Sequence, residues 1–197
     1  MIAALAGAHA ACMLLFLGAI ALERARAYAL HVTPLTWSSA LAGAVAIGVS
    51  AWVSSPGAPT TPVVLACAAV SAATDVQTGY VFDRVLLATA LVLLTLTMVD
   101  GGFLQASGGA AAAAALLLIP YVCSRGRGVG LGDVKLAATI GFGLGTAGTF
   151  AALWFAAICG GSWAATLLCF GRVHRRARIP FAPFLVAGAA YATLRLA

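Results

Sequence analysis

The stretch that decides the fold is residues 124–148, SRGRGVGLGDVKLAATIGFGLGTAG. A basic, glycine-rich segment leads through Asp133 and Lys135 into an apolar run that continues to residue 170. This run is too long for one membrane span, which needs about 20 residues. Its only turn-like part is GFGLGTAGT, so we expect the run to divide near residues 145–150.

The composition of the whole chain indicates a membrane protein. It has 197 residues, of which 63% are hydrophobic and 8% are charged, whereas a soluble domain has about 25% charged residues. We predict an all-α fold, a polytopic transmembrane helical bundle that forms a single domain over residues 1–197. About eight spans are expected, with six or seven as alternatives: 3–22, 35–53, 62–82, 85–99, 104–123, 134–149, 150–170 and 180–196.

The basic residues predict which loops face the cytoplasm. Ten of the 11 lysines and arginines fall in alternate loops, and Arg195 is the exception. The basic loops are 23–34, 75–84, 124–135 and 171–179. By the positive-inside rule these loops are cytoplasmic and both termini are outside. The basic residues follow the first apolar run, which favours a retained span over a secretory signal.

Several other patterns have simpler explanations than a binding site. The five cysteines contain no C-x-x-C pair, and the three histidines have no nearby partner ligand, so no metal site or cofactor is predicted. The basic segment 172–178 is explained by topology, with the lipid bilayer and not nucleic acid as partner. The GLGTAG at 143–148 lacks a βαβ context and is interpreted as packing and turn glycines.

The chain has five acidic residues, and two of them differ from the rest. Asp75 and Asp133 lie at the boundaries of apolar runs, with two predicted spans between them. An even number of crossings returns the chain to the same side, so both carboxylates are expected at the cytoplasmic boundary. We interpret Glu23 and Asp100 as interfacial residues and expect Asp83 to cap a helix that starts near Val85.

Two close carboxylates in a partly dry site share a proton, which gives one acid and one base. Such a pair can activate water for peptide hydrolysis without a metal. Gly128, Gly130 and Gly132 alternate before the second aspartate, which would suit an extended backbone that an unfolded substrate could pair with. A flexible loop between helices is the alternative interpretation of these glycines.

The residues around both aspartates resemble those of a known family. GLGDVKL (130–136) resembles the G-x-G-D-x-K signature of the type IV prepilin peptidases, which are GxGD intramembrane aspartyl proteases. Val81-Phe82-Asp83, which follow the first aspartate, resemble the family's Ile-Pro-Asn. RIPFAPFLVAG (178–188) resembles the Pro-Phe-Gly-Pro-Phe-Leu stretch that opens its last helix.

This resemblance implies a function and a set of site residues. It makes Asp75 and Asp133 the catalytic pair and Gly130 and Gly132 the glycines of the signature. Lys135 would steady the loop or pair with a carboxylate or lipid phosphate, or it would be a plain boundary anchor. The implied substrate is a prepilin-like protein with a basic leader before an apolar helix, cut after a glycine on the cytoplasmic side. The implied location is the cytoplasmic membrane of a bacterium or archaeon.

The chain also departs from the family pattern. Val-Phe-Asp replaces Ile-Pro-Asn, and Ala182 stands where glycine is usual. Residues 23–34 are too short for the zinc-binding insertion linked to N-methylation, so methyltransferase activity is not predicted. Alternative functions are a GxGD protease for another membrane substrate, a small transporter or proton relay, and a catalytically weak component of a pilus or secretion assembly.

Overall fold

The computed structural model describes residues 60–126, 128–171 and 180–196. These ranges contain helices and no strand, which confirms the all-α prediction. The helices are α3 (Thr60–Thr78), α4 (Asp83–Val99), α5 (Phe103–Cys123), α6 (Leu131–Cys169) and α7 (Ala182–Leu196). The predicted spans at 3–22 and 35–53 lie outside the described residues, and the number of spans stays a prediction.

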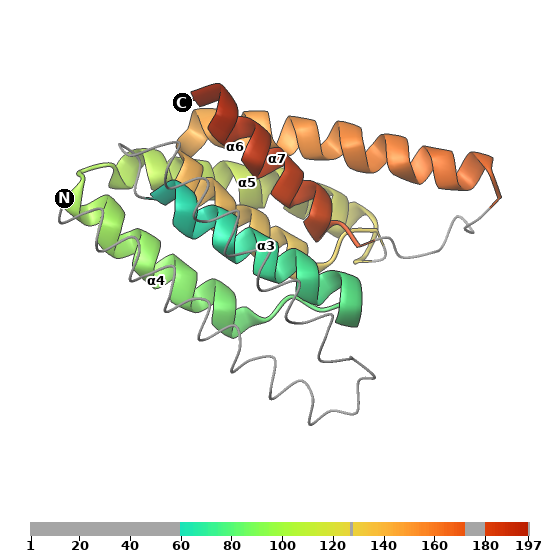
Figure 1. Ribbon diagram of the computed structural model, residues 1–197, viewed down its shortest axis with the longest axis horizontal. Helices are drawn as coiled ribbons and strands as arrows, with labels where there is room; N and C mark the ends of the chain where they lie inside the picture. The colour runs from blue at the N-terminus through green and yellow to red at the C-terminus, as the bar shows by residue number, and fades with distance from the viewer. Residues whose placement is uncertain (1–59, 127, 172–179, 197) are drawn as a thin grey trace.

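Helix α6 reverses direction at Gly145, where φ is 67° and ψ is −177°. The Thr149 hydroxyl lies 2.6 Å from the Gly145 carbonyl oxygen and 3.4 Å from that of Gly141. In a straight helix, residues eight apart would be separated by about 12 Å along the axis. The first half of α6 (131–144) and its second half (146–169) therefore run back along one another (Figure 1). The break predicted near residues 145–150 is confirmed.

The described helices form a bundle whose two ends differ (Figure 1). Hydrogen bonds join the start of α6 to the start of α4, and the start of α7 to the last turns of α3. We call this the aspartate end, made by residues 75–83, 124–135 and 180–182. The opposite end, made by the α4–α5 turn at 99–103 and by Gly145, is called the far end.

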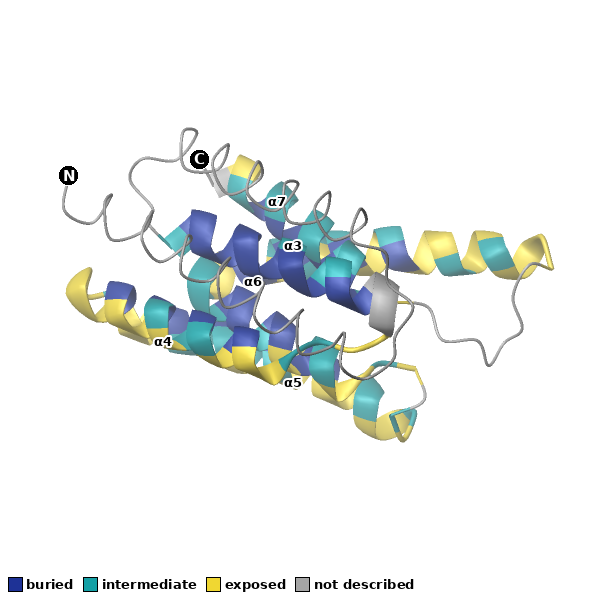
Figure 2. Ribbon diagram, turned by 60° about the horizontal axis from the view of Figure 1, so that its bottom comes forward, coloured by how far each residue is buried: buried dark blue, intermediate teal, exposed yellow. Residues whose placement is uncertain are grey.

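Helix α3 is the most enclosed part of the bundle (Figure 2). Val63, Val64 and Ala68 have no exposed surface, whereas α4, α5 and the second half of α6 expose large apolar side chains. These include Leu87, Leu91, Leu104, Ile119, Trp154 and Ile158. Two of the described helices, α5 and α6, are long and apolar enough to cross a membrane. An apolar exterior around an enclosed helix is expected for a protein surrounded by lipid. The chain is therefore a membrane protein.

Small residues allow close helix packing in the bundle. A Cβ atom on Gly109 would overlap the backbone of Gly141, and a Cβ on Gly141 would overlap Gly109 in return. A Cβ on Gly188 of α7 would likewise overlap the backbone of Ala152. These contacts hold α5 and α7 against the two halves of α6.

Helix α3 ends earlier than the predicted span at 62–82. Gly79 adopts a positive φ of 69°, and its N–H donates a 2.8 Å hydrogen bond to the Asp75 carbonyl oxygen. Glycine accepts this left-handed conformation without steric penalty and commonly ends helices. The short connection 79–82 then leads directly into α4 at the aspartate end.

Candidate active site

Asp75 lies in the last turns of α3, and its side chain is buried. Its Oδ2 accepts a 3.3 Å hydrogen bond from the backbone N–H of Ala182, which is 107 residues away in sequence. Ala182 is the first residue of α7, where backbone N–H groups have no partner within the helix. The start of α7 therefore stabilises and orients this carboxylate.

Asp133 is the third residue of α6 and is partly buried. Its Oδ2 accepts a 3.1 Å hydrogen bond from the backbone N–H of Gly130. Gly130 precedes the helix in an extended conformation, with φ −81° and ψ 153°. The side chain thus turns back over the residues that open its own helix, as an acidic residue at this position commonly does.

The structure brings these two carboxyl groups to the same end of the bundle. They belong to α3 and to the first half of α6, which pack against one another. Asp75 lies in the last turns of α3, and Asp133 lies in the first turn of α6. Two carboxylates that repel one another ionise in coupled steps and can hold one proton between them.

The two signature glycines leave room around Asp133. A Cβ atom on Gly130 would lie 3.3 Å from Asp133 Oδ2, and a Cβ on Gly132 would lie 3.1 Å from the Cβ of Val81. Gly132 is already helical because α6 begins at Leu131. The expectation of an extended backbone across all the alternating glycines is therefore wrong at Gly132, which serves close packing instead.

Lys135 pairs with Asp83 and with neither of the carboxylates described above. Its Nζ lies 2.8 Å from both carboxylate oxygens of Asp83. Asp83 is itself the first residue of α4, and Phe82 occupies the N-cap position without a side-chain cap. The prediction that Asp83 caps the helix is therefore wrong, because its carboxylate is directed to a lysine on α6.

Sequence reasoning missed two features of this end. The first is the contact between Ala182 and Asp75, which depends on where α7 packs. The segment 178–188 resembles the family, but the resemblance did not indicate this contact. Pairing of Lys135 with a carboxylate was one of the predicted alternatives, but its partner Asp83 was not predicted. Among the described residues, no group of three or more His, Cys, Asp or Glu side chains is placed to hold a metal ion.

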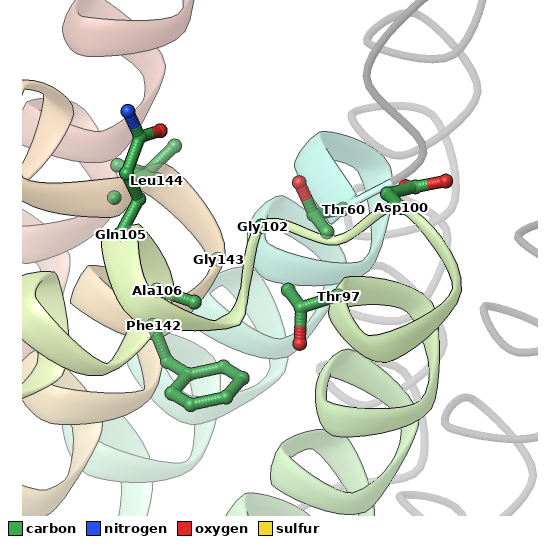
Figure 3. Close-up of a pocket in the computed structure, with 10 residues that line it drawn as sticks. Thr60, Thr97, Asp100, Gly102, Gln105, Ala106, Phe142, Gly143 and Leu144 are labelled. Carbon is green, nitrogen blue, oxygen red and sulfur yellow. The ribbon is translucent and has the colours of Figure 1, made fainter.

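A cavity of about 200 Å³ lies at the far end (Figure 3), and neither Asp75 nor Asp133 lines it. It contains none of the predicted site residues. Asp100, at its edge, is exposed. The lining residues are Thr60, Thr97, Asp100, Gly102, Gln105, Ala106, Phe142, Gly143, Leu144 and Gly145.

The sequence profile described as the type IV leader peptidase family matches residues 62–165. This range contains both aspartates, both signature glycines and Lys135. The chain belongs to the type IV leader peptidase family. The resemblance seen in the sequence is thereby confirmed at the level of the family.

One curated relative shows the extent of this likeness. The prepilin leader peptidase/N-methyltransferase of Bacillus subtilis (strain 168) is 43% identical to this leader peptidase family member over 67 residues. The match covers 34% of this chain and 27% of the relative, so it spans about a quarter of the relative's length. No solved structure matches the chain.

Proposed function

We propose that the chain is a membrane-embedded aspartic endopeptidase that removes the basic leader peptide from prepilin-like proteins. The observation that carries this proposal is the placement of Asp75 and Asp133 at one end of the bundle. They belong to different helices that pack against one another, and each accepts a hydrogen bond from one backbone N–H. Membership of the leader peptidase family supports the substrate class.

The proposed reaction uses water as the nucleophile. The ionised carboxylate takes a proton from water while the water oxygen attacks the carbonyl carbon of the scissile peptide bond. The protonated carboxyl group donates a hydrogen bond to the carbonyl oxygen, which favours the tetrahedral intermediate. The C–N bond then breaks, and the aspartate pair returns a proton to the leaving amine. Neither a metal nor a covalent intermediate is required.

The surroundings of the pair suit such a substrate. A prepilin-like substrate has an apolar helix, which would stay in lipid beside the exposed apolar side chains of the bundle. Its scissile bond would then lie at the depth of the aspartate end. Arg125 and Lys135 also belong to this end, and Arg84 directly follows it in α4. By the positive-inside rule we propose that this end faces the cytoplasm.

The proposal covers the whole chain as one protease domain in the cytoplasmic membrane. Residues 23–34, where longer family members carry the insertion linked to methylation, lie outside the described residues, and no methyltransferase activity is proposed.

The experiment is co-expression of the full chain with a prepilin, with loss of the leader followed by mobility shift and mass spectrometry. Asp75→Asn and Asp133→Asn should each lower the cleavage rate by about 10²–10⁴-fold, since each removes one partner of an acid–base pair. Asp100→Asn at the far end is the matched control and should cleave at the normal rate. Normal cleavage by both site variants would contradict the catalytic assignment, whereas cleavage of a different membrane protein would change only the substrate.

A further inference from the structure

The aspartate end contains an ion pair that the proposed reaction does not use. Lys135 Nζ lies 2.8 Å from each carboxylate oxygen of Asp83. The two residues are 52 positions apart in sequence, and they join the first residue of α4 to the early turns of α6. An ammonium group shared by two oxygens restricts the relative placement of the two helix starts.

A second contact lies next to this ion pair. The missing side chain of Gly132 lets Val81 approach the first turn of α6, as its 3.1 Å distance from a Cβ placed there shows. Gly132 and Lys135 lie on either side of Asp133 in sequence. Gly132 contacts Val81, and Lys135 pairs with Asp83. The connection 79–82 and the first residue of α4 are therefore each held to α6 at one point, on either side of Asp133 in sequence.

The same connection is tied to the other carboxyl group. The N–H of Gly79 donates a 2.8 Å hydrogen bond to the backbone carbonyl of Asp75. Residues 79–82 run from this point to the start of α4. A continuous set of contacts thus leads from Asp75 through the connection to the turn of α6 that carries Asp133.

We infer that Asp83 and Lys135 are a positioning pair that sets the relative placement of Asp75 and Asp133. The expected effect on the reaction rests on the proposed function. The expected effect on the geometry is independent of that function. The Lys135 and Asp83 side chains are 45% and 69% exposed. Exposed ion pairs contribute little to global stability, so their loss should change turnover far more than unfolding.

The first test measures steady-state cleavage of a purified prepilin. Asp83→Ala and Lys135→Ala should each lower kcat by about tenfold to a hundredfold, because small misplacements of catalytic groups have effects of this size. KM should stay within about twofold and the melting temperature should not change. The double variant D83K/K135D restores the pair with its charges exchanged and should recover kcat above both single variants. Asp100→Ala, which removes a carboxylate at the other end of α4, should have normal kcat.

The second test needs no activity. In a chain whose native cysteines are replaced by alanine, Val81→Cys and Gly132→Cys place two Cβ atoms 3.1 Å apart. A small separation of the two segments brings these atoms into the range of about 3.5–4.5 Å that a disulfide needs. Disulfide formation under mild oxidation should slow about tenfold when Asp83→Ala or Lys135→Ala is added, and should recover with the exchanged pair.

The two tests separate failure of this inference from failure of the proposed function. If the unmodified chain cleaves no prepilin but disulfide formation depends on the ion pair, the proposed function fails and the positioning geometry stands. Unchanged disulfide formation in the alanine variants, unchanged kcat, or an exchanged pair as poor as the single variants would each overturn the positioning role.

Discussion

The two ends of the bundle both carry aspartates, but they surround them differently. At the aspartate end, Asp75 and Asp133 are buried or partly buried, and each accepts a hydrogen bond from a backbone N–H at the start of a helix. At the far end, Asp100 is exposed on the turn between α4 and α5, beside an open cavity (Figure 3). The same type of side chain is thus held by a backbone N–H at one end and is solvated at the other.

This difference suggests a division of roles within the bundle. Near the far end, the close contacts are between backbones. Gly109 of α5 and Gly141 of α6 meet one turn before the reversal at Gly145. At the aspartate end, the close contact of Gly132 is with a side chain in a short connection. We expect substitutions near the far end to change mainly the stability and those at the aspartate end to change mainly the rate.

The largest effect is expected from Gly132→Val at the aspartate end. The new side chain would displace Val81 and with it the turn that carries Asp133, so the rate of prepilin cleavage should fall about a hundredfold. Gly102→Val at the far end is the control, because a Cβ on Gly102 has no atom within 4 Å. Cleavage kinetics of both variants measure the difference. Equal cleavage rates for the two variants would show that the two ends do not differ in this respect. Recovery of the rate by Val81→Ala in the Gly132→Val background would show that the contact with Val81 causes the loss.

A smaller effect, on stability, is expected from Gly141→Val. The added side chain would overlap the backbone of Gly109 and should destabilise the bundle by about 1–3 kcal/mol. Gly161→Val in the same helix is the control, because the space around Gly161 is open. Denaturation in detergent followed by circular dichroism measures both. A Gly141→Val protein as stable as the control would show that α5 and α6 are less closely packed than described.

The smallest effect is expected at the reversal itself. Thr149→Val removes the hydroxyl that lies 2.6 Å from the Gly145 carbonyl oxygen, and should lower the free energy of unfolding by about 1 kcal/mol. Thr166→Val removes a 2.8 Å hydrogen bond to Ser162 on the exposed part of the same helix, and its effect should be smaller. If the two variants unfold alike, the hydrogen bond between Thr149 and Gly145 contributes no more to stability than the exposed one.

Much of this fold could be predicted because it follows from local patterns. Apolar runs predict helices in lipid, and the described helices begin and end within a few residues of the predicted spans. The glycine-rich stretch around Gly145 predicted the reversal, since glycine alone adopts its backbone conformation easily. Counting the spans between Asp75 and Asp133 placed both at one end without knowledge of any tertiary contact.

The remaining contacts depend on how helices rotate and pack, which no local pattern determines. The partner of Lys135 depends on which face of α4 meets α6, so Asp83 was assigned to a cap. The N–H of Ala182 reaches Asp75 only because α7 packs against α3. In both cases the residues were visible in the sequence, but the pairing depends on a tertiary arrangement.

The bond between Ala182 and Asp75 also has a consequence for biosynthesis. Its donor belongs to the last described helix, α7, whereas its acceptor belongs to the first described helix, α3. A nascent chain therefore cannot complete the candidate site until residue 182 and the helix after it have left the ribosome and entered the bilayer. Incompletely translated copies should carry both aspartates and yet be unable to cleave neighbouring proteins during their own insertion.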